Sequence, residues 1–205
     1  LTPTTVWAST AAGLFRSTSS GDAWGAVSPG VTGYVVDALA IDPLAPAFIY
    51  AGTNGGGVFV SANGGGNWTA PNTGLAATWI DALAIDPQTP AILYAAIDDG
   101  GLFKSMDGGE SWVSAGTGLT VLEVRALAIN PATPATVYAG TYGGGVFVST
   151  DAGEHWGPTN TGLTALNILA LAIDPVTPSF IYAGTFGGGV FKSLDGGGTW
   201  GPHSG

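Results

Sequence analysis

The sequence predicts an all-β fold, a β-propeller of four-stranded antiparallel blades built from a 44-residue repeat. Five copies of the pattern S-x-D-x-G-x-x-W, two of them imperfect, begin at residues 17, 61, 105, 149 and 193. Repeats of this length indicate a stacked or radial architecture, and four short strands in about 40–45 residues are typical of one propeller blade. The five predicted blades cover about residues 1–30, 31–74, 75–118, 119–162 and 163–205 of a single domain, 1–205.

The unit 119–162 shows the four predicted strands in order. The apolar run 126–129 is the innermost strand, and the β-branched and aromatic run 136–141 is the second. Glycines 143–145 form a tight loop into the third strand, 146–149, and the S-x-D-x-G-x-x-W turn leads into the fourth strand at Trp156. The inner strands alternate alanine with large aliphatic residues, which favours burial on both faces near a crowded axis.

The first unit lacks the sequence of an innermost strand. Leu1 aligns with Leu44, which lies after the inner strand 38–41 of the next unit. Five full units would need 5 × 44 = 220 residues and the chain has 205, so we expect five blades, the first without its innermost strand. Two alternatives stay open: a closed five-bladed ring with one thin blade, or an arc that is an excerpt of a longer array. The uncapped edge favours self-association through the incomplete first blade.

Composition and charge exclude several classes of protein. With 45% hydrophobic and 9% charged residues the chain can bury a large core, which excludes disorder despite 35 glycines. The net charge is −10, and the four basic residues are Arg16, Lys104, Arg125 and Lys192, so we expect no nucleic-acid partner. No apolar run approaches the length of about 20 residues of a membrane helix, so we expect no membrane insertion. The absence of cysteine excludes disulfides and thiolate chemistry.

The repeated turn resembles a known motif. The segments 105–112, 149–156 and 193–200 are similar to the Asp-box, or bacterial neuraminidase repeat, of sialidases, xyloglucan-cleaving glycoside hydrolases, sortilin-type receptors and photosystem assembly factors. The two earlier copies depart from it, since Asn63 and Ser19 replace the aspartate. The resemblance implies a propeller in which the box joins the third and fourth strands. It leaves function open, because these families do unrelated things.

We predict a structural role for the aspartate and tryptophan positions that recur in the copies of this turn. Its short carboxylate can accept hydrogen bonds from N–H groups of its own turn, and its Trp can pack between blades as an apolar wedge. This role is predicted for Asp107, Asp151 and Asp195, and for Trp24, Trp68, Trp112, Trp156 and Trp200. The alternative is a calcium site, but these acids lie one per blade and two units lack them. We therefore expect no metal and no cofactor.

The units differ in two loops, the B–C loop between the second and third strands and the D–A connection to the next unit. Both should lie on one face, where their side chains ring one mouth of the central channel, and loops on a rigid scaffold commonly carry binding sites. Aromatic rings with nearby carboxylates and an amide suit sugars. The predicted ligand-binding residues are Tyr34, Asp37, Trp79, Asp81, Asp98, Glu123, Arg125, Tyr142, Asn167 and Phe186. Alternatively, Trp79 plugs the channel or contacts another subunit, and Asp98 with Asp99 helps to bind a cation.

The resemblance suggests two catalytic alternatives, and the residues support neither strongly. Sialidases of this repeat family use an arginine triad, whereas this chain has only Arg16 and Arg125. Xyloglucan-cleaving relatives use two aspartates across a cleft between two propellers. Asp37 and Asp81 occupy equivalent positions in successive units, with Glu123 one unit further, but a second propeller is absent. We assign no catalytic residue.

We therefore expect a non-catalytic binding or scaffold module, extracellular or at the cell surface, that engages a glycan or a protein through the variable loops. One alternative is a structural subunit of a multimeric or filamentous assembly, which the near-identical units and low charge favour. The other is a glycoside hydrolase-like fragment of the xyloglucanase type.

Overall fold

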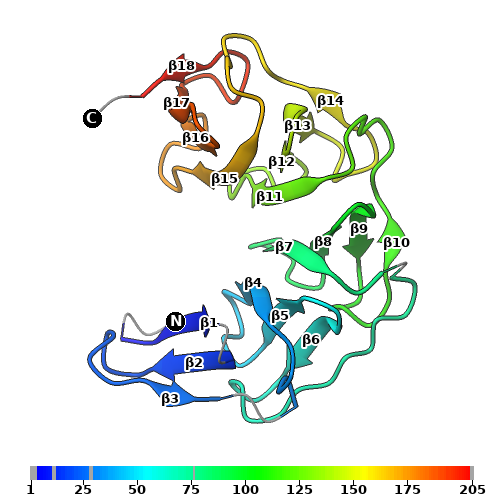
Figure 1. The fold of residues 1–205 in the computed structure, drawn as a ribbon, viewed down its shortest axis with the longest axis vertical. Helices are drawn as coiled ribbons and strands as arrows, with labels where there is room; N and C mark the ends of the chain where they lie inside the picture. The colour runs from blue at the N-terminus through cyan, green and yellow to red at the C-terminus, as the bar shows by residue number, and fades with distance from the viewer. Residues whose placement is uncertain (1–3, 11–12, 28–29, 76, 204–205) are drawn as a thin grey trace.

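The computed structural model of the chain describes residues 4–10, 13–27, 30–75 and 77–203, so Leu1 lies outside the described residues. The described part folds into five antiparallel sheets, and it contains no helix long and apolar enough to cross a membrane. Figure 1 shows the sheets arranged radially as propeller blades, which confirms the predicted fold class.

Each sheet is one blade, and its strands follow one another in sequence order. Blade one holds β1 (Val6–Thr10), β2 (Gly13–Ser17) and β3 (Gly25–Ala26), and blade two holds β4 (Val36–Ile41), β5 (Ile49–Thr53) and β6 (Gly57–Ser61). Blade three holds β7 (Ile80–Ile85), β8 (Leu93–Ile97), β9 (Gly101–Ser105) and β10 (Val113–Ser114). Blade four holds β11 (Val124–Ile129), β12 (Val137–Thr141), β13 (Gly145–Ser149) and β14 (Gly157–Pro158). Blade five holds β15 (Ile168–Ile173), β16 (Ile181–Thr185), β17 (Gly189–Ser193) and β18 (Gly201–Pro202).

Blade one has three strands in the described residues, as predicted. Its β1 pairs with β2 so that Trp7 lies opposite Arg16, just as Tyr50 of β5 lies opposite Val60 of β6. The strand β1 is thus equivalent to the second strand of the other blades.

Blade two differs from the prediction, because its fourth strand is reduced to a single bridge between Val60 and Thr69. Pro71 explains the loss. In blade three the equivalent residue is Ala115, whose N–H donates a hydrogen bond of 2.8 Å to the carbonyl of Leu102. Proline has no N–H, so this ladder bond cannot form at position 71.

The repeated Trp does not begin the fourth strand, which corrects the prediction for Trp156. The backbone N–H of Trp156 donates instead to the carbonyl of Thr117 in the preceding unit, at 2.9 Å. The strand β14 starts only at Gly157. Because the indole is inserted between blades, its backbone is turned away from the ladder of its own sheet.

The hydrophobic core lies between neighbouring blades. One buried cluster joins Ala82 and Tyr94 of blade three to Val124, Phe147 and Trp156 of blade four. Four repeated Phe residues and three repeated Tyr residues are buried: Phe59, Phe103, Phe147, Phe191, Tyr50, Tyr94 and Tyr138. Their equivalents in the terminal blades, Phe15 and Tyr182, are only half-buried. Stability therefore depends on the contact of each blade with the next.

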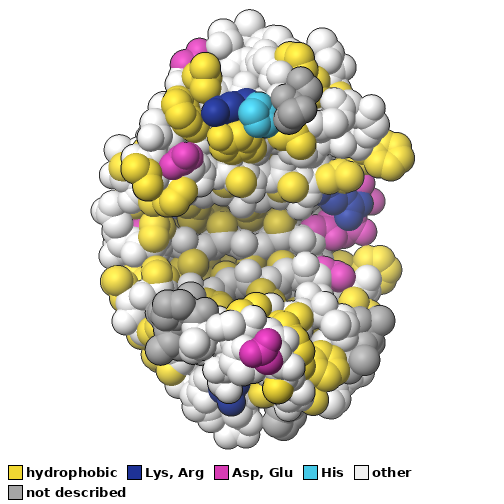
Figure 2. All heavy atoms as spheres, turned by 90° about the vertical axis from the view of Figure 1, so that its left-hand side faces the viewer, with side chains coloured by type: hydrophobic (Ala, Val, Ile, Leu, Met, Phe, Trp, Pro, Cys, Tyr) yellow, Lys and Arg dark blue, Asp and Glu magenta, His cyan; other side chains and the backbone are white. Residues whose placement is uncertain are grey.

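The chain forms an open arc and not a closed five-bladed ring. The inner strands β4, β7, β11 and β15 pack side by side, whereas the sheet of blade five stands apart from blade one (Figure 1). Figure 2 shows the hollowed face that the arc encloses. The inner strands are not buried on both faces as expected. Leu83 and Leu127 are among the partly exposed residues that line this hollow, because one face of each inner strand is turned toward it.

A candidate ligand-binding mouth

The loops that vary between units lie together on one face, as the sequence predicts. The B–C loop of one blade is hydrogen-bonded to the D–A connection of the next, for example Gly55 N–H to the Thr78 carbonyl at 3.0 Å and Gly143 N–H to the Leu166 carbonyl at 3.1 Å. The repeated turns, which we call box turns, are bonded instead to the turn between the first two strands of their own blade. An example is Ala152 N–H to the Ala135 carbonyl at 2.8 Å. We call the variable face the mouth; it comprises residues 34–37, 54–56, 78–81, 98–100, 122–125, 142–144, 166–169 and 186–188.

Four of the ten predicted ligand-binding residues meet in one charged cluster. The guanidinium of Arg125 forms ion pairs with Asp81 at 3.0 Å, with Asp98 at 3.3 Å and with Glu123. The side chain of Arg125 is 34% exposed and that of Asp81 only 17%. Figure 2 shows a group of acidic and basic side chains at one edge of the molecule, with hydrophobic side chains beside it. The mouth thus combines a charged centre with apolar surroundings.

A register irregularity in each inner strand positions these residues. Val124 pairs with Thr141 and Ala126 with Gly140, so Arg125 is left out of the ladder between them. The same irregularity sets apart Asp37, Asp81 and Leu169 in the other blades. A β-bulge re-aims a side chain and interrupts pairing, and bulges are frequent next to functional sites. Here the bulge brings one variable residue from each of blades two to five to the mouth.

Burial shapes the electrostatics of the cluster. Desolvation raises the pKa of Asp81 to about 6; Arg125 opposes this rise, while Asp98, Asp37 and Glu123 add to it. Burial also raises the pKa of Asp37. The pKa of Arg125 is raised, first by its hydrogen bond with Glu123. The guanidinium stays charged while the pKa of Asp81 lies at about 6, so the net charge of the mouth changes in mildly acidic solution.

The predicted aromatic residues lie on the mouth with much of their surface exposed. Trp79 is 52% exposed, and its backbone pairs with that of Asn54 in an isolated antiparallel β-bridge. Phe186 is 64% exposed. Tyr142 forms a bridge with Asn167, whose carbonyl accepts the N–H of Phe186 at 2.8 Å. Among the described residues, no stacking contact joins two of these predicted aromatic side chains. They are separate apolar surfaces around the charged cluster.

Tyr34 and Asp37, the last two predicted residues, also lie at the mouth, beside exposed aliphatic side chains. The ring of Tyr34 packs on Phe59, with centroids 5.5 Å apart, and Asp37 acts on Asp81 electrostatically. The same loops carry exposed aliphatic residues that were not among the predicted ligand-binding residues: Val35, Leu122, Leu166 and Leu169. The signal was available, because all four occupy variable positions of the repeat.

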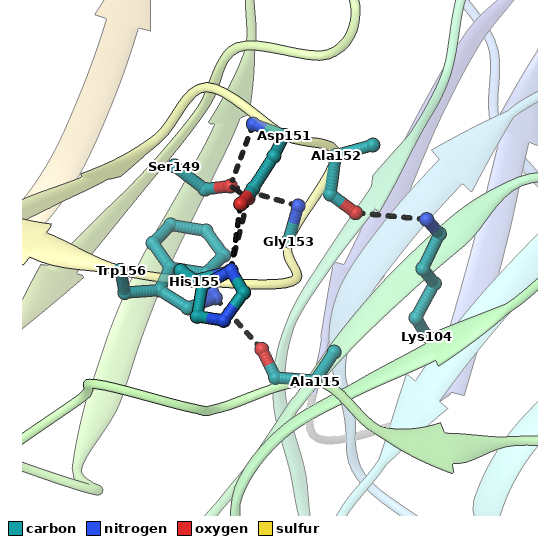
Figure 3. Close-up of polar contacts among 8 residues, drawn as sticks. All are labelled: Lys104, Ala115, Ser149, Asp151, Ala152, Gly153, His155 and Trp156. Carbon is teal, nitrogen blue, oxygen red and sulfur yellow. Dashed lines mark hydrogen bonds and ion pairs between the residues drawn. The ribbon is translucent and has the colours of Figure 1, made fainter.

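The opposite face carries the box turns, and Figure 3 shows the one in blade four. Asp151 Oδ1 accepts hydrogen bonds from Ser149 Oγ at 2.7 Å and from His155 N–H at 2.9 Å, and its Oδ2 lies 2.8 Å from His155 Nδ1. These bonds lower the pKa of Asp151, with the backbone N–H of His155 the largest cause. Asp107 Oδ1 and Asp195 Oδ1 accept equivalent bonds from Ser111 and Thr199 N–H. The carboxylates are thus used by their own turns.

One group on this face has ligand types that suit a metal. Single oxygen or nitrogen atoms of Asp151, Glu154 and His155 lie within 4.8 Å of one another. All three residues are exposed, and both oxygens of Asp151 already interact within the turn. We assign no metal site to this group.

The chain matches no protein-family model and no curated protein. Its fold is similar to that of solved propeller structures. An ancestral GH74 enzyme superposes with a TM-score of 0.71 at 23% identity over 87% of this chain and 25% of that chain. The GH74 xyloglucanase from Xanthomonas campestris superposes with a TM-score of 0.70 at 20% identity over 97% of this chain and 32% of that chain.

A third similar structure belongs to a different class of protein. YCF48 from Cyanidioschyzon merolae superposes with a TM-score of 0.63 at 17% identity over 86% of this chain and 58% of that chain. At these identities the likeness shows the fold alone. The chain spans about a quarter to a third of the length of the two GH74 structures.

Proposed function

We propose that this chain is a non-catalytic binding module, outside the cell or at its surface, that engages a glycan or a protein through the mouth. The observation that carries the proposal is the composition of this face. Exposed aromatic rings surround a cluster in which one arginine is held by three carboxylates. Aromatic residues and arginine are the residue types that dominate binding energy at interfaces.

The construction of the mouth supports a binding role. The B–C loops of blades two and four are hydrogen-bonded to the D–A connection of the next blade, and the inner strands below pack side by side. A surface held in this way loses little conformational entropy when a ligand binds. Arg125 is already oriented by its ion pairs, which use four of its five N–H donors, so it can offer the remaining N–H, on Nη1, to a hydroxyl or carbonyl oxygen without rearrangement.

The geometry of the mouth supports a catalytic role less well than it supports a binding role. A pKa of about 6 would suit a general acid at Asp81. An inverting glycosidase, however, needs two carboxyl groups about 6.5–9.5 Å apart that flank one bond. Asp81, Asp98 and Glu123 converge on the same guanidinium and do not face one another across a cleft.

The decisive variant is Trp79→Ala, because this indole is the largest exposed side chain among the predicted site residues. We expect the variant to lose about tenfold or more in affinity, since anchors of this type contribute about 1–2 kcal/mol or more. Ligands are first found on a glycan array and a peptide array, and affinities are then measured by calorimetry. Trp24→Ala is the matched control: it removes another half-exposed indole, from blade one, and should leave affinity unchanged.

Three outcomes would contradict the proposal. Equal loss of affinity in the Trp79 and Trp24 variants would place the ligand elsewhere. Release of reducing sugar from xyloglucan or another β-glucan, abolished by Asp81→Asn, would make the chain a glycosidase. A defined multimer or a filament in light scattering without added ligand would favour a structural subunit.

A further inference from the structure

The junction of blades three and four and the junction of blades four and five share the same tyrosine and indole contacts, and Figure 3 shows the first of them. Tyr94 Oη and Lys104 Nζ of blade three both donate to the carbonyl of Ala152 in the next box turn, each at 2.8 Å. In the other direction, Trp156 Nε1 of blade four donates to the carbonyl of Ala115 at 2.7 Å. One blade thus offers a tyrosine and a lysine, and the next offers a carbonyl and an indole.

The junction of blades four and five repeats the tyrosine and indole bonds, with Val148 in the place of the lysine. Tyr138 Oη donates to the carbonyl of Gly196 at 2.9 Å, and Trp200 Nε1 donates to the carbonyl of Thr159 at 2.8 Å. The aromatic ring also covers the glycine that follows this carbonyl. A Cβ added at Gly153 would meet Tyr94 at 2.8 Å, and one at Gly197 would meet Tyr138 at 3.3 Å. Each of these two junctions therefore has the same set of hydrogen-bond donors and acceptors.

Blade five ends in a face that carries the same donors without a partner blade. Tyr182 and Lys192 stand two units after Tyr94 and Lys104. Among the described residues neither donates a hydrogen bond to a box turn; Lys192 Nζ lies instead over two rings of its own blade, 4.4 Å from the centroid of Phe180 and 5.1 Å from that of Tyr182. Val190 on the same face is 42% exposed, whereas the equivalent Val146 is fully buried. The exposed valine, and the tyrosine and lysine without a box-turn carbonyl in the described chain, mark one half of a junction whose other half is missing.

Blade one presents the complementary half. Trp24 is 43% exposed, while the equivalent Trp68, Trp112, Trp156 and Trp200 are 3–8% exposed. Ser20 has the left-handed conformation of Ala152, with φ of 58° at both residues. Nothing lies within 4 Å of a Cβ added at Gly21, the position that an aromatic ring covers in the other blades. In the described chain, no aromatic ring of another blade covers the box turn of blade one.

The acceptor for an indole is also in place on blade five. His203 stands two units after Ala115, and its N–H donates to the Val190 carbonyl at 2.7 Å, as Ala115 does to Leu102 at 2.8 Å. The carbonyl of His203 is therefore oriented like that of Ala115, which accepts the Trp156 indole.

The inner part of the blade-five face requires an inner strand from its partner. At the preceding junction a Cβ on Gly140 would meet Ile168 of the next blade at 2.5 Å, so that isoleucine fills the space. Gly184, the equivalent residue of blade five, meets only Ala170 of its own blade. A second copy of this chain would not supply the isoleucine, because the described blade one has no inner strand. Figure 1 also shows that the opening is too small for five more blades.

We propose that one or two further blades of the same repeat, supplied by a segment of this protein outside residues 1–205, fill the opening between blade five and blade one. The first added blade places a β-branched aliphatic residue against Gly184 and its indole on the carbonyl of His203. The last added blade places its aromatic ring over Gly21 and its hydroxyl on the carbonyl of Ser20. The mouth then becomes a continuous ring around a closed channel.

The test adds blades after blade five and measures the effect on Trp24 in blade one, at the other end of the arc. Residues 204–205 are replaced by a copy of residues 160–203, or by two copies in series, which continues the 44-residue period. Trp24→Ala is introduced into the 205-residue chain and into both extended chains. If the ring closes, Trp24 becomes buried. Its removal should then lower Tm by at least about 6 °C more in one of the extended chains than in the original chain.

Controls separate ring closure from the general stabilisation that any added repeat gives. Trp68→Ala removes an indole that is already buried, so it should lower Tm by the same amount in all three chains. Equal effects of Trp24→Ala in all three chains would overturn the proposal. So would a doubled mass of the original chain in light scattering with Trp24 protected, because a second copy would then be the occupant.

A second observation tests the source of the added blades. The reading frame that encodes this chain should contain at least one more box of the S-x-D-x-G-x-x-W type, spaced 44 residues from box 17–24 or box 193–200. A reading frame that holds only the five boxes described would overturn the assignment to this protein's own chain.

Discussion

At the scale of single residues, the box-turn aspartates show how one carboxylate organises a turn. Asp195 Oδ1 accepts hydrogen bonds from Ser193 Oγ and Thr199 N–H, and its Oδ2 accepts one from Thr199 Oγ1. The backbone N–H of Thr199 is the largest cause that lowers the pKa of Asp195 to about 2. The hydrogen bonds of Ser111 lower the pKa of Asp107 to about 2 as well. The folded turn therefore prefers the ionised carboxylate.

These lowered pKa values predict a loss of stability in acid. The pKa in the unfolded chain is near 3.8, so the folded state binds fewer protons than the unfolded state between about pH 4 and pH 2. The stabilisation is complete above pH 4 and disappears as the pH falls through the folded value near 2. We expect Tm to fall across this window, and to fall less steeply in Asp195→Asn, when both are followed by circular dichroism.

Glu154→Gln is the control for this pH series. Glu154 is an exposed carboxylate of the box turn in blade four, and among the described residues its side chain accepts no hydrogen bond. Its replacement should leave the acid slope of Tm unchanged. An Asp195→Asn chain with the slope of the original protein would show that the turn does not depend on the charge.

At the scale of elements, the indole between two blades is the main link of each junction. Trp156 is buried and donates to Ala115, whereas Trp24 is half-exposed on the open face of blade one. Replacing a buried large aromatic residue by alanine costs about 3–5 kcal/mol. We expect a loss of this size for Trp156→Ala and less than half of it for Trp24→Ala, measured as the free energy of unfolding in urea.

Equal losses in these two variants would mean that blade one is covered in solution. The comparison is well matched, because both residues end a box turn and both substitutions remove the same atoms. A closed ring or an associated state would bury Trp24 to the extent seen for Trp156.

At the scale of the whole molecule, the arc is a row of blades that each contact only their neighbours. Such arrays lose structure from their ends, because terminal units have one stabilising junction and internal units have two. We expect the amides of β16 and β17 in blade five to exchange hydrogen faster than those of β12 and β13 in blade four. Hydrogen exchange followed by mass spectrometry measures this difference directly.

The two strand pairs serve as each other's control, since their sequences are nearly identical and both are fully hydrogen-bonded. Different exchange rates therefore report position in the arc and not local sequence. Equal protection in blades four and five would show that the open face of blade five is covered.

Much of the fold could be predicted, because the same pattern of strand and turn residues occurs in five successive units. The chain order of the strands, the missing inner strand of blade one and the face that carries the variable loops all follow from the 44-residue spacing. Local exceptions were harder to foresee. Pro71 removes one ladder bond and with it a short strand, and Trp156 leaves its own sheet to bond with the preceding unit.

The sequence by itself determined the blades, since strand propensity and turn chemistry act within 44 residues, and it selected the variable positions that form the mouth. Tertiary structure decided how those positions meet. Arg125 reaches Asp81 and Asp98 of the neighbouring blade only because bulges re-aim one residue per inner strand and the blades pack side by side. The open arc was likewise a tertiary outcome. Ring closure depends on the angle between packed sheets, which long-range packing sets and which no local pattern encodes.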